Sequence, residues 1–215
     1  KKRSDLEVIG EIAWCENGVY LKERPSFTLD PLFHAGAYYP QEAGSMVLDN
    51  LLKQLELPAA TKVLDLCAAP GGKSTLIASF LGGEGLLVSN EVIQARSRIL
   101  KENMSKWGYA NSVVTNNDPK DFQRLPQFFD LIVVDAPCSG EGMFRKDEKA
   151  REEWSEDNVQ LCCGRQKRIL ADVWDALIPG GYLIYSTCTF NTNENEENVE
   201  WMVEELGAEL IQMEL

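Results

Sequence analysis

Short apolar runs alternate with longer amphipathic stretches from about residue 61 onward. The short runs are rich in Val, Ile and Leu, which is typical of strands, whereas the longer stretches repeat apolar residues at helical spacing. We predict strands over 62–67, 85–91, 112–118, 129–135, 181–188 and 208–213, and helices over 73–81, 93–107, about 158–178 and 194–206. Helix stops are expected at Gly82-Gly83, Gly108 and Pro179-Gly180-Gly181. The alternation predicts an α/β fold with a doubly wound, mostly parallel sheet.

The pattern before residue 60 is weaker. Residues 42–57 carry apolar side chains at helical spacing, which predicts a helix packed against the sheet. Residues 1–30 indicate irregular strands or the tail of an upstream domain, and the absence of an initial Met predicts a fragment. We therefore divide the chain into an N-terminal segment, 1–35, and a main domain, 36–215.

Whether the net charge argues against nucleic-acid binding depends on how the charges are distributed along the chain. The chain of 215 residues carries a formal net charge of −13, which argues against binding to nucleic acid. However, residues 194–215 hold eight acids and no base, so the rest of the chain has 34 − 8 = 26 acids against 21 bases. Basic residues then cluster at 145–151 and 165–168. Such clusters are solvated faces unless other features place them beside a site.

The cysteine pattern excludes two classes of protein. Six cysteines are spread along the chain without CxxC spacing or nearby histidines, so neither a zinc site nor a secreted disulfide scaffold is predicted. The chain shows no signal peptide and no apolar run long enough for a membrane helix. We expect reduced thiols, a cytoplasmic location, no bound metal and no membrane contact. His34 is the only histidine, which disfavours histidine-based catalysis.

Ligands of open α/β sheets bind at the carboxyl ends of the strands, so polar residues there carry functional weight. The first predicted strand runs into a turn of small residues that opens a helix: Cys67, Ala68, Ala69, Pro70, Gly71, Gly72 and Lys73. Backbone N–H groups of such a turn can meet a carboxylate or a phosphate, although a purely structural turn has the same shape. A P-loop is excluded because Cys67 stands where its first glycine is required.

Acidic residues end the next two strands. Glu91 lies nineteen residues after Gly72, close to the offset at which an acid binds a ribose diol. Asp118 could accept a hydrogen bond from an exocyclic amine such as that of adenine, or it could simply be the N-cap of the segment after Pro119. The turn and the two acids together predict a nucleoside site.

Two further strand ends carry cysteine. Asp135 and Cys138 follow the strand over 129–135, and Cys188 ends the strand over 181–188. A single cysteine is usually a buried thiol, but two at adjacent strand ends beside an aspartate favour catalysis. We expect Cys15, Cys162 and Cys163 to serve packing only.

These motifs resemble the Sun/Fmu family of RNA (cytosine-5)-methyltransferases. The resemblance is carried by residues 36–42, 65–73, 116–118, 135–140, 154–170 and 186–191, which include the motifs DLCAAPGGK, DAPCSG and STCT. The run over 141–146 further resembles the RsmF-like (YebU-like) branch, which acts on bacterial ribosomal RNA.

The resemblance implies S-adenosylmethionine as cofactor, RNA as partner and a Rossmann-like class I methyltransferase fold over 36–215, with its last antiparallel strand missing from this fragment. It further implies that residues 67–73 hold the methionine end of the cofactor, Glu91 its ribose and Asp118 its adenine. Asp135 would lie between cofactor and target base, Cys188 would be the nucleophile, and Cys138 would assist release.

Chemistry requires a thiolate independently of the family, because carbon 5 of cytosine becomes nucleophilic only after addition at carbon 6. Asp135 is placed to act at ring N3 during that addition. Cys138 follows a proline, as does the nucleophile of DNA cytosine-5 methyltransferases, so the reverse assignment stays open. A tRNA substrate, a catalytically silent ribosome-assembly factor, and a small-molecule or protein methyltransferase are the alternative functions.

Overall fold

A five-stranded parallel sheet forms the centre of the computed structural model, which describes residues 6–214. Its strands are β3 (Lys62–Asp65), β4 (Leu86–Asn90), β5 (Ser112–Thr115), β6 (Phe129–Asp135) and β7 (Leu177–Ser186). They lie in the order β5-β4-β3-β6-β7, with every neighbouring pair parallel. The predicted doubly wound α/β class is therefore confirmed. The order reverses between β3 and β6, and this switch point is where such sheets bind ligands.

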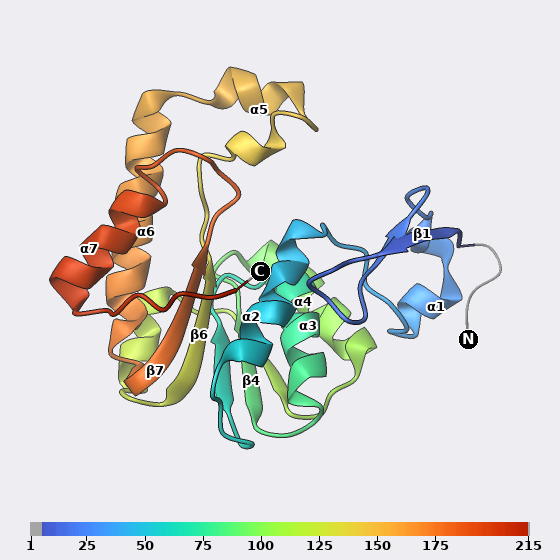
Figure 1. Ribbon diagram of the computed structural model, residues 1–215, viewed down its shortest axis with the longest axis horizontal. Coiled ribbons are helices and arrows are strands. Elements are labelled where there is room, and N and C mark those ends of the chain that lie inside the picture. The colour runs from blue at the N-terminus through green and yellow to red at the C-terminus, as the bar shows by residue number, and fades with distance from the viewer. Residues whose placement is uncertain (1–5, 215) are drawn as a thin grey trace.

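Helices cover both faces of the sheet (Figure 1). One face packs against α2 (Val47–Gln54), α3 (Gly72–Leu81) and α4 (Gln94–Trp107), and the other against α6 (Glu156–Trp174) and α7 (Glu196–Leu206). Successive strand residues serve opposite faces: Leu131 and Val133 belong to the first core, and Ile132 and Val134 to the second. Apolar residues are thus needed at every position from 131 to 134 of β6, which explains the continuous apolar run there.

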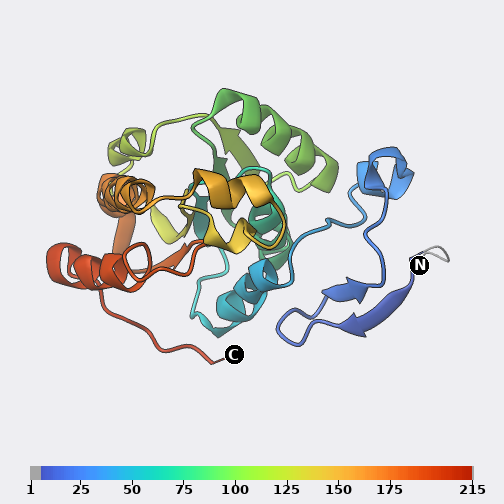
Figure 2. The same cartoon turned by 90° about the horizontal axis from the view of Figure 1, so that it is seen from above.

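The N-terminal part forms a small antiparallel hairpin beside the sheet (Figure 2). It consists of β1 (Val8–Glu11) and β2 (Val19–Leu21), followed by the short helix α1 (Pro31–His34). Ile12 and Cys15 belong to the first core cluster, which also contains Leu52 of α2. Residues 1–5 of the predicted N-terminal segment lie outside the described residues. The helix predicted over 42–57 is shorter, a 3₁₀ turn at Gly44–Met46 leading into α2.

The predicted end of the long helix is wrong. Helix α6 stops at Trp174, and Leu177 already begins β7. Phe129 pairs with Leu177 whereas Leu131 pairs with Tyr182, so residues 178–181 form a bulge in β7 opposite Asp130. Pro179 lies in this exposed bulge, where its missing N–H breaks no ladder hydrogen bond. The Pro-Gly-Gly sequence therefore marks a strand bulge and not a helix stop.

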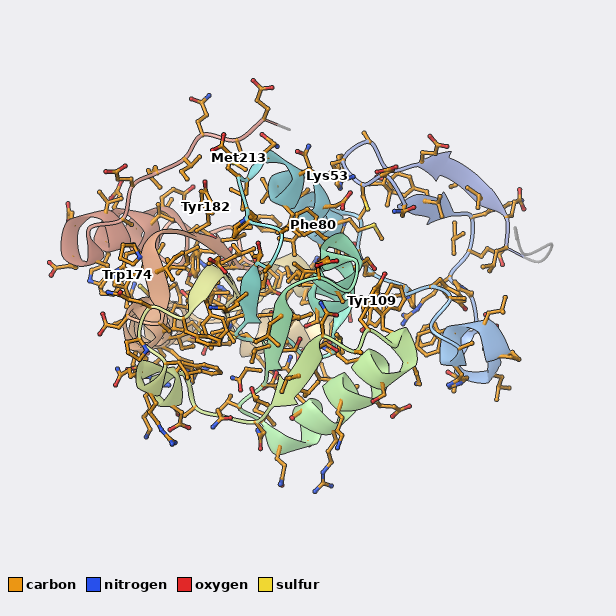
Figure 3. All side chains as sticks on the ribbon, turned by 90° about the horizontal axis from the view of Figure 1, so that it is seen from below. Lys53, Phe80, Tyr109, Trp174, Tyr182 and Met213 are labelled. Carbon is orange, nitrogen blue, oxygen red and sulfur yellow. The ribbon has the colours of Figure 1, made fainter. Side chains whose placement is uncertain are left out.

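The strand predicted over 208–213 is also wrong, because described residues 207–214 form no strand. This segment returns from α7 across the molecule towards α2, past Tyr182, and Met213 lies near its α2 end (Figure 3). There Gln54 exchanges two hydrogen bonds with the backbone of Glu214, at 2.8 and 2.9 Å. A strand exists only with a hydrogen-bonded neighbour, and this course leaves the segment without one.

Two unpredicted elements lie above the carboxyl ends of the strands: the 3₁₀ turn η4 (Glu141–Met143) and helix α5 (Glu148–Glu153) (Figures 1 and 2). A further 3₁₀ segment, η3 (Pro119–Arg124), follows β5. Within residues 6–214, no helix is both long and apolar enough to span a membrane.

Candidate active site

The candidate site lies at the carboxyl ends of β3, β6 and β7, at the switch point of the sheet. Asp135 is the last residue of β6 and pairs in register with Ser186, the last residue of β7. Cys138 and Cys188 follow these two strand ends. Because parallel strands end at one edge, three chain segments that are far apart in sequence converge there.

The two cysteines at these strand ends are in direct contact. Their sulfur atoms lie 3.0 Å apart, and the backbone N–H of Cys188 donates to the sulfur of Cys138 at 3.3 Å. The hydrogen bond from Cys138 lowers the pKa of the Cys188 thiol to about 7, against burial, which acts in the opposite direction. The same contact and burial raise the pKa of Cys138. Cys188 is also the more exposed of the two, so both its lowered pKa and its exposure favour it as the thiolate of the pair.

Asp135 forms an ion pair beside the thiols. Its Oδ2 lies 2.7 Å from Nζ of Lys73, and its Oδ1 accepts a hydrogen bond from the hydroxyl of Ser186 at 2.9 Å. Lys73 belongs to the first turn of α3, so this pair joins the small-residue turn after β3 to the end of β6. The structure therefore brings the predicted turn, Asp135 and both cysteines into one site.

The turn over 67–73 forms one wall of a pocket of about 210 Å³. Gly71 has a φ of 117°, a left-handed conformation that suits glycine, and α3 begins directly after it. A β-carbon on Gly72 would lie 2.8 Å from Oε1 of Gln41, so glycine keeps this wall open. The lining consists of Tyr39, Pro40, Gln41, Ser45, Asp65, Cys67, Ala68, Ala69, Pro70, Gly72, Lys73 and Asp135.

Two buried acceptors in this lining have no partner among the described residues: Asp65 Oδ1 and Gln41 Oε1. Buried polar atoms are normally hydrogen-bonded, so these two fit a ligand that brings donors, such as an ammonium group. Burial raises the pKa of Asp65 to about 7, although Ser74 donates to its other oxygen at 2.6 Å.

Sequence reasoning assigned no role to Asp65, Tyr39, Gln41 or Ser45. Asp65 ends β3 and could have been found by the strand-end rule that selected the other acids. The remaining three come from the chain before α2, which reaches the pocket only through the tertiary fold.

Glu91 and Asp118 are not part of this lining. The Glu91 carboxylate accepts a hydrogen bond from the Ile93 backbone N–H at 2.9 Å and lies 3.1 Å from Arg96 Nη1. Asp118 caps η3 in a reciprocal capping box with Asp121. Asp118 therefore has the local capping role that its position before Pro119 also suggested.

The remaining cysteines and the histidine lie elsewhere. Cys15, Cys162 and Cys163 are buried, in agreement with a packing role, and burial raises the pKa of Cys67 to about 12. His34 is exposed in the N-terminal part. Residues 6–214 contain no cluster of side chains suited to a metal ion.

The pocket at the switch point and the sheet order define a Rossmann-like fold of the class I methyltransferase type. Residues 52–215 match the family model "16S rRNA methyltransferase RsmB/F", and residues 1–43 match "N-terminal domain of 16S rRNA methyltransferase RsmF". The chain belongs to the RsmB/F family, as the Sun/Fmu resemblance predicted. Its cofactor is S-adenosylmethionine, and the open wall and unpartnered acceptors of the pocket fit the methionine end of that molecule.

Individual relatives agree with this family. The chain is 39% identical over 198 residues to ribosomal RNA small subunit methyltransferase F of Pectobacterium atrosepticum, covering 89% of this chain and 40% of that protein. It resembles the crystal structure of NSun6 from Pyrococcus horikoshii with SFG, with a TM-score of 0.79 and 30% identity, covering 92% of this chain and 51% of that one. A methyltransferase homologue from Pyrococcus horikoshii gives a TM-score of 0.78 and 31% identity, covering 94% and 62%. The chain thus spans about 40% of the length of its curated relative.

Proposed function

We propose that this protein transfers a methyl group from S-adenosylmethionine to carbon 5 of a cytosine in RNA, and that this RNA is ribosomal RNA. The observation that carries the proposal is the 3.0 Å contact between Cys138 and Cys188 beside the Lys73–Asp135 pair. A small-molecule or protein methyltransferase would need the cofactor pocket but not two thiols in contact above it.

Cys188 acts as the nucleophile in this proposal. Its lowered pKa supplies thiolate at neutral pH, and the thiolate adds to carbon 6 of the cytosine. The electron pair of the 5,6 double bond becomes available at carbon 5, which takes the methyl group. When bound, S-adenosylmethionine supplies that methyl group as an electrophile on sulfonium.

Asp135 acts on the opposite side of the ring. Addition at carbon 6 builds negative charge towards N3, and a carboxyl group at N3 stabilises it by sharing a proton. The Lys73 ammonium, 2.7 Å from Asp135, supplies the proton that the carboxyl passes to N3. Residues 67–73 hold the methionine end of the cofactor, with Glu91 and Asp118 proposed for its ribose and adenine.

Cys138 completes the reaction by removing the proton from carbon 5 after methylation. The electron pair of that C–H bond re-forms the 5,6 double bond, and the bond between carbon 6 and Cys188 sulfur breaks. The raised pKa of Cys138 keeps a proton on its sulfur in the resting site, so that proton leaves to solvent before the sulfur takes the one from carbon 5. The cytosine must leave any stack, at a cost of a few kcal/mol that falls in single-stranded RNA.

We further propose that residues 36–215 are the catalytic domain, with residues 1–35 as a separate N-terminal segment, and that the protein acts in the cytoplasm. A tRNA substrate would keep the same chemistry. A silent ribosome-assembly factor would bind RNA without forming a covalent adduct.

Trapping on modified RNA tests the proposal. The protein is incubated with S-adenosylmethionine and 16S rRNA transcribed with 5-fluorocytidine, in which fluorine replaces the carbon-5 proton that must be removed to release the enzyme. We expect an adduct that survives denaturing electrophoresis and is lost in Cys188→Ala. Cys138→Ala should accumulate adduct on unmodified RNA, and the opposite assignment would exchange these two results. Bisulfite sequencing of ribosomal RNA from cells with and without the gene would then identify the modified cytosine.

A further inference from the structure

Glu194 is a fully buried carboxylate beneath the two cysteine loops. It accepts hydrogen bonds from the Ser139 backbone N–H at 3.0 Å, Gln166 Nε2 at 2.7 Å and Asn191 Nδ2 at 2.9 Å. No lysine, arginine or histidine within the described part of the chain forms an ion pair with it. A buried carboxylate is tolerated only when neighbouring donors satisfy it, so these hydrogen bonds hold their donors firmly.

The three donors come from different segments around the site. Ser139 directly follows Cys138, and Asn191 lies three residues after Cys188. Gln166 projects from α6 and also donates to the carbonyl of Pro137, the residue before Cys138, at 3.0 Å. The carboxylate is thus linked to both sides of Cys138 and to the loop that carries Cys188.

Rigid elements support Glu194 in turn. Its backbone carbonyl accepts a hydrogen bond from the hydroxyl of Tyr185 on β7 at 2.7 Å. Asn198 of α7 donates to Gln166 Oε1 at 2.7 Å, which fixes the orientation of the Gln166 amide. The carboxylate is therefore held between β7, α6 and α7.

We propose that Glu194 is a positioning residue that clamps the Cys138 loop to the Cys188 loop and so sets the distance between the two sulfur atoms. The inference rests on the proposed function for the roles of the two cysteines. Glu194 itself touches neither sulfur and takes no part in bond making. Its effect reaches the reaction through the Cys138–Cys188 hydrogen bond, which stabilises the Cys188 thiolate only at contact distance.

Glu194→Gln tests the proposal because it keeps the shape of the side chain and replaces one acceptor oxygen with an NH₂ group. Each carboxylate oxygen has its own amide donor, Asn191 for Oε1 and Gln166 for Oε2, so one of them would face an NH₂ group. Neither the Asn191 nor the Gln166 amide can flip its oxygen towards that NH₂ group without losing another hydrogen bond. Asn191 Oδ1 accepts from the Glu194 N–H at 2.9 Å, and Gln166 Oε1 accepts from Asn198. One loop must therefore separate from the clamp.

Alkylation of Cys188 by iodoacetamide, measured from pH 5.5 to 9 by peptide mass spectrometry, reports the result without RNA. In the wild type we expect half-maximal rate near pH 7. In Glu194→Gln the midpoint should move towards the ordinary thiol value of about 8.5, which slows alkylation at pH 7 about 10-fold. Binding of S-adenosylmethionine should stay near the wild-type value, because the cofactor pocket does not include Glu194.

Glu197→Gln is the matched control, because this exposed glutamate bonds only the side chain of Asn193, at 2.9 and 3.0 Å, and should leave the midpoint in place. If Glu194→Gln does not fold, Gln166→Met, which removes the donor shared by Glu194 and Pro137, should raise the midpoint in the same direction. A folded variant that binds the cofactor and keeps the wild-type pH profile would overturn the clamp. Failure of adduct formation with RNA would instead concern the proposed function alone.

Discussion

The backbone N–H of Gly142 donates a hydrogen bond to the carbonyl oxygen of Cys188 at 2.8 Å, and a β-carbon at position 142 would lie 2.6 Å from that same oxygen. The turn η4 thus rests directly on the backbone of the proposed nucleophile. Only glycine allows this approach, because the atom that a side chain would meet is backbone and cannot rotate away.

Gly142→Ala should therefore displace Cys188. We expect kcat for RNA methylation to fall at least about 10-fold, since small displacements in an active site are costly, while cofactor affinity stays unchanged. Gly164→Ala on α6 is the control, because nothing lies within 4 Å of its added β-carbon. That variant should keep wild-type activity and gain about 0.5–1 kcal/mol of stability in urea unfolding. Equal activities in the two variants would contradict the prediction.

The pH dependence of adduct formation should follow the Cys188 thiolate. The pKa of Cys188 is lowered to about 7, so the rate on 5-fluorocytosine RNA should rise as pH increases through about 7 and then level off. Cys138→Ala removes the donor to Cys188, and we expect its profile to shift to higher pH. Cys162→Ala, in the buried interior of α6, should leave the profile unchanged. A rate that falls between pH 6 and pH 8 would disprove the assignment of a thiolate nucleophile.

Asp65 should make the cofactor-free protein less stable as pH rises. Its folded pKa of about 7 exceeds the ordinary value of 3.8, so the folded state holds more protons than the unfolded state between these values. The free energy of unfolding then decreases as pH rises from about 4 to 7, by up to about 4 kcal/mol. Asp65→Asn should remove this decrease and weaken cofactor binding, because a pocket acceptor is lost. Urea unfolding at pH 5 and pH 8 measures the difference, with Asp172→Asn on α6 as the control.

Phe190 should contact RNA next to the target base. Its side chain is 80% exposed, two residues after Cys188, and its backbone N–H is held by Glu141 at 2.8 Å. Stacking of a base on an aromatic ring contributes about 1–3 kcal/mol, so Phe190→Ala should raise KM for RNA about 5-fold or more. Phe190→Trp should retain RNA affinity, and Leu29→Ala, an exposed apolar residue of the N-terminal part, should have no effect. An unchanged KM in Phe190→Ala would show that the ring takes no part in binding.

Sequence reasoning succeeded where structure depends on local pattern. Strands β3 to β7 and helices α3, α4, α6 and α7 were predicted because a buried parallel strand must be apolar on both faces and these helices repeat apolar residues at their own period. The predicted helix stop at Pro179 and the predicted strand over 208–213 were wrong. A proline ends a helix or enters a bulge depending on the neighbouring strand, and a strand forms only if another strand lies beside it.

By itself the sequence determined the α/β alternation, the small-residue turn after β3 and the presence of cysteine at two strand ends, because these features depend on residues close together in the chain. Only the tertiary structure decided that two sulfur atoms fifty residues apart touch, that Gln41 closes the cofactor pocket and that Glu194 supports both cysteine loops. These relationships are set by the order of the strands and the packing of whole elements, which no local pattern specifies.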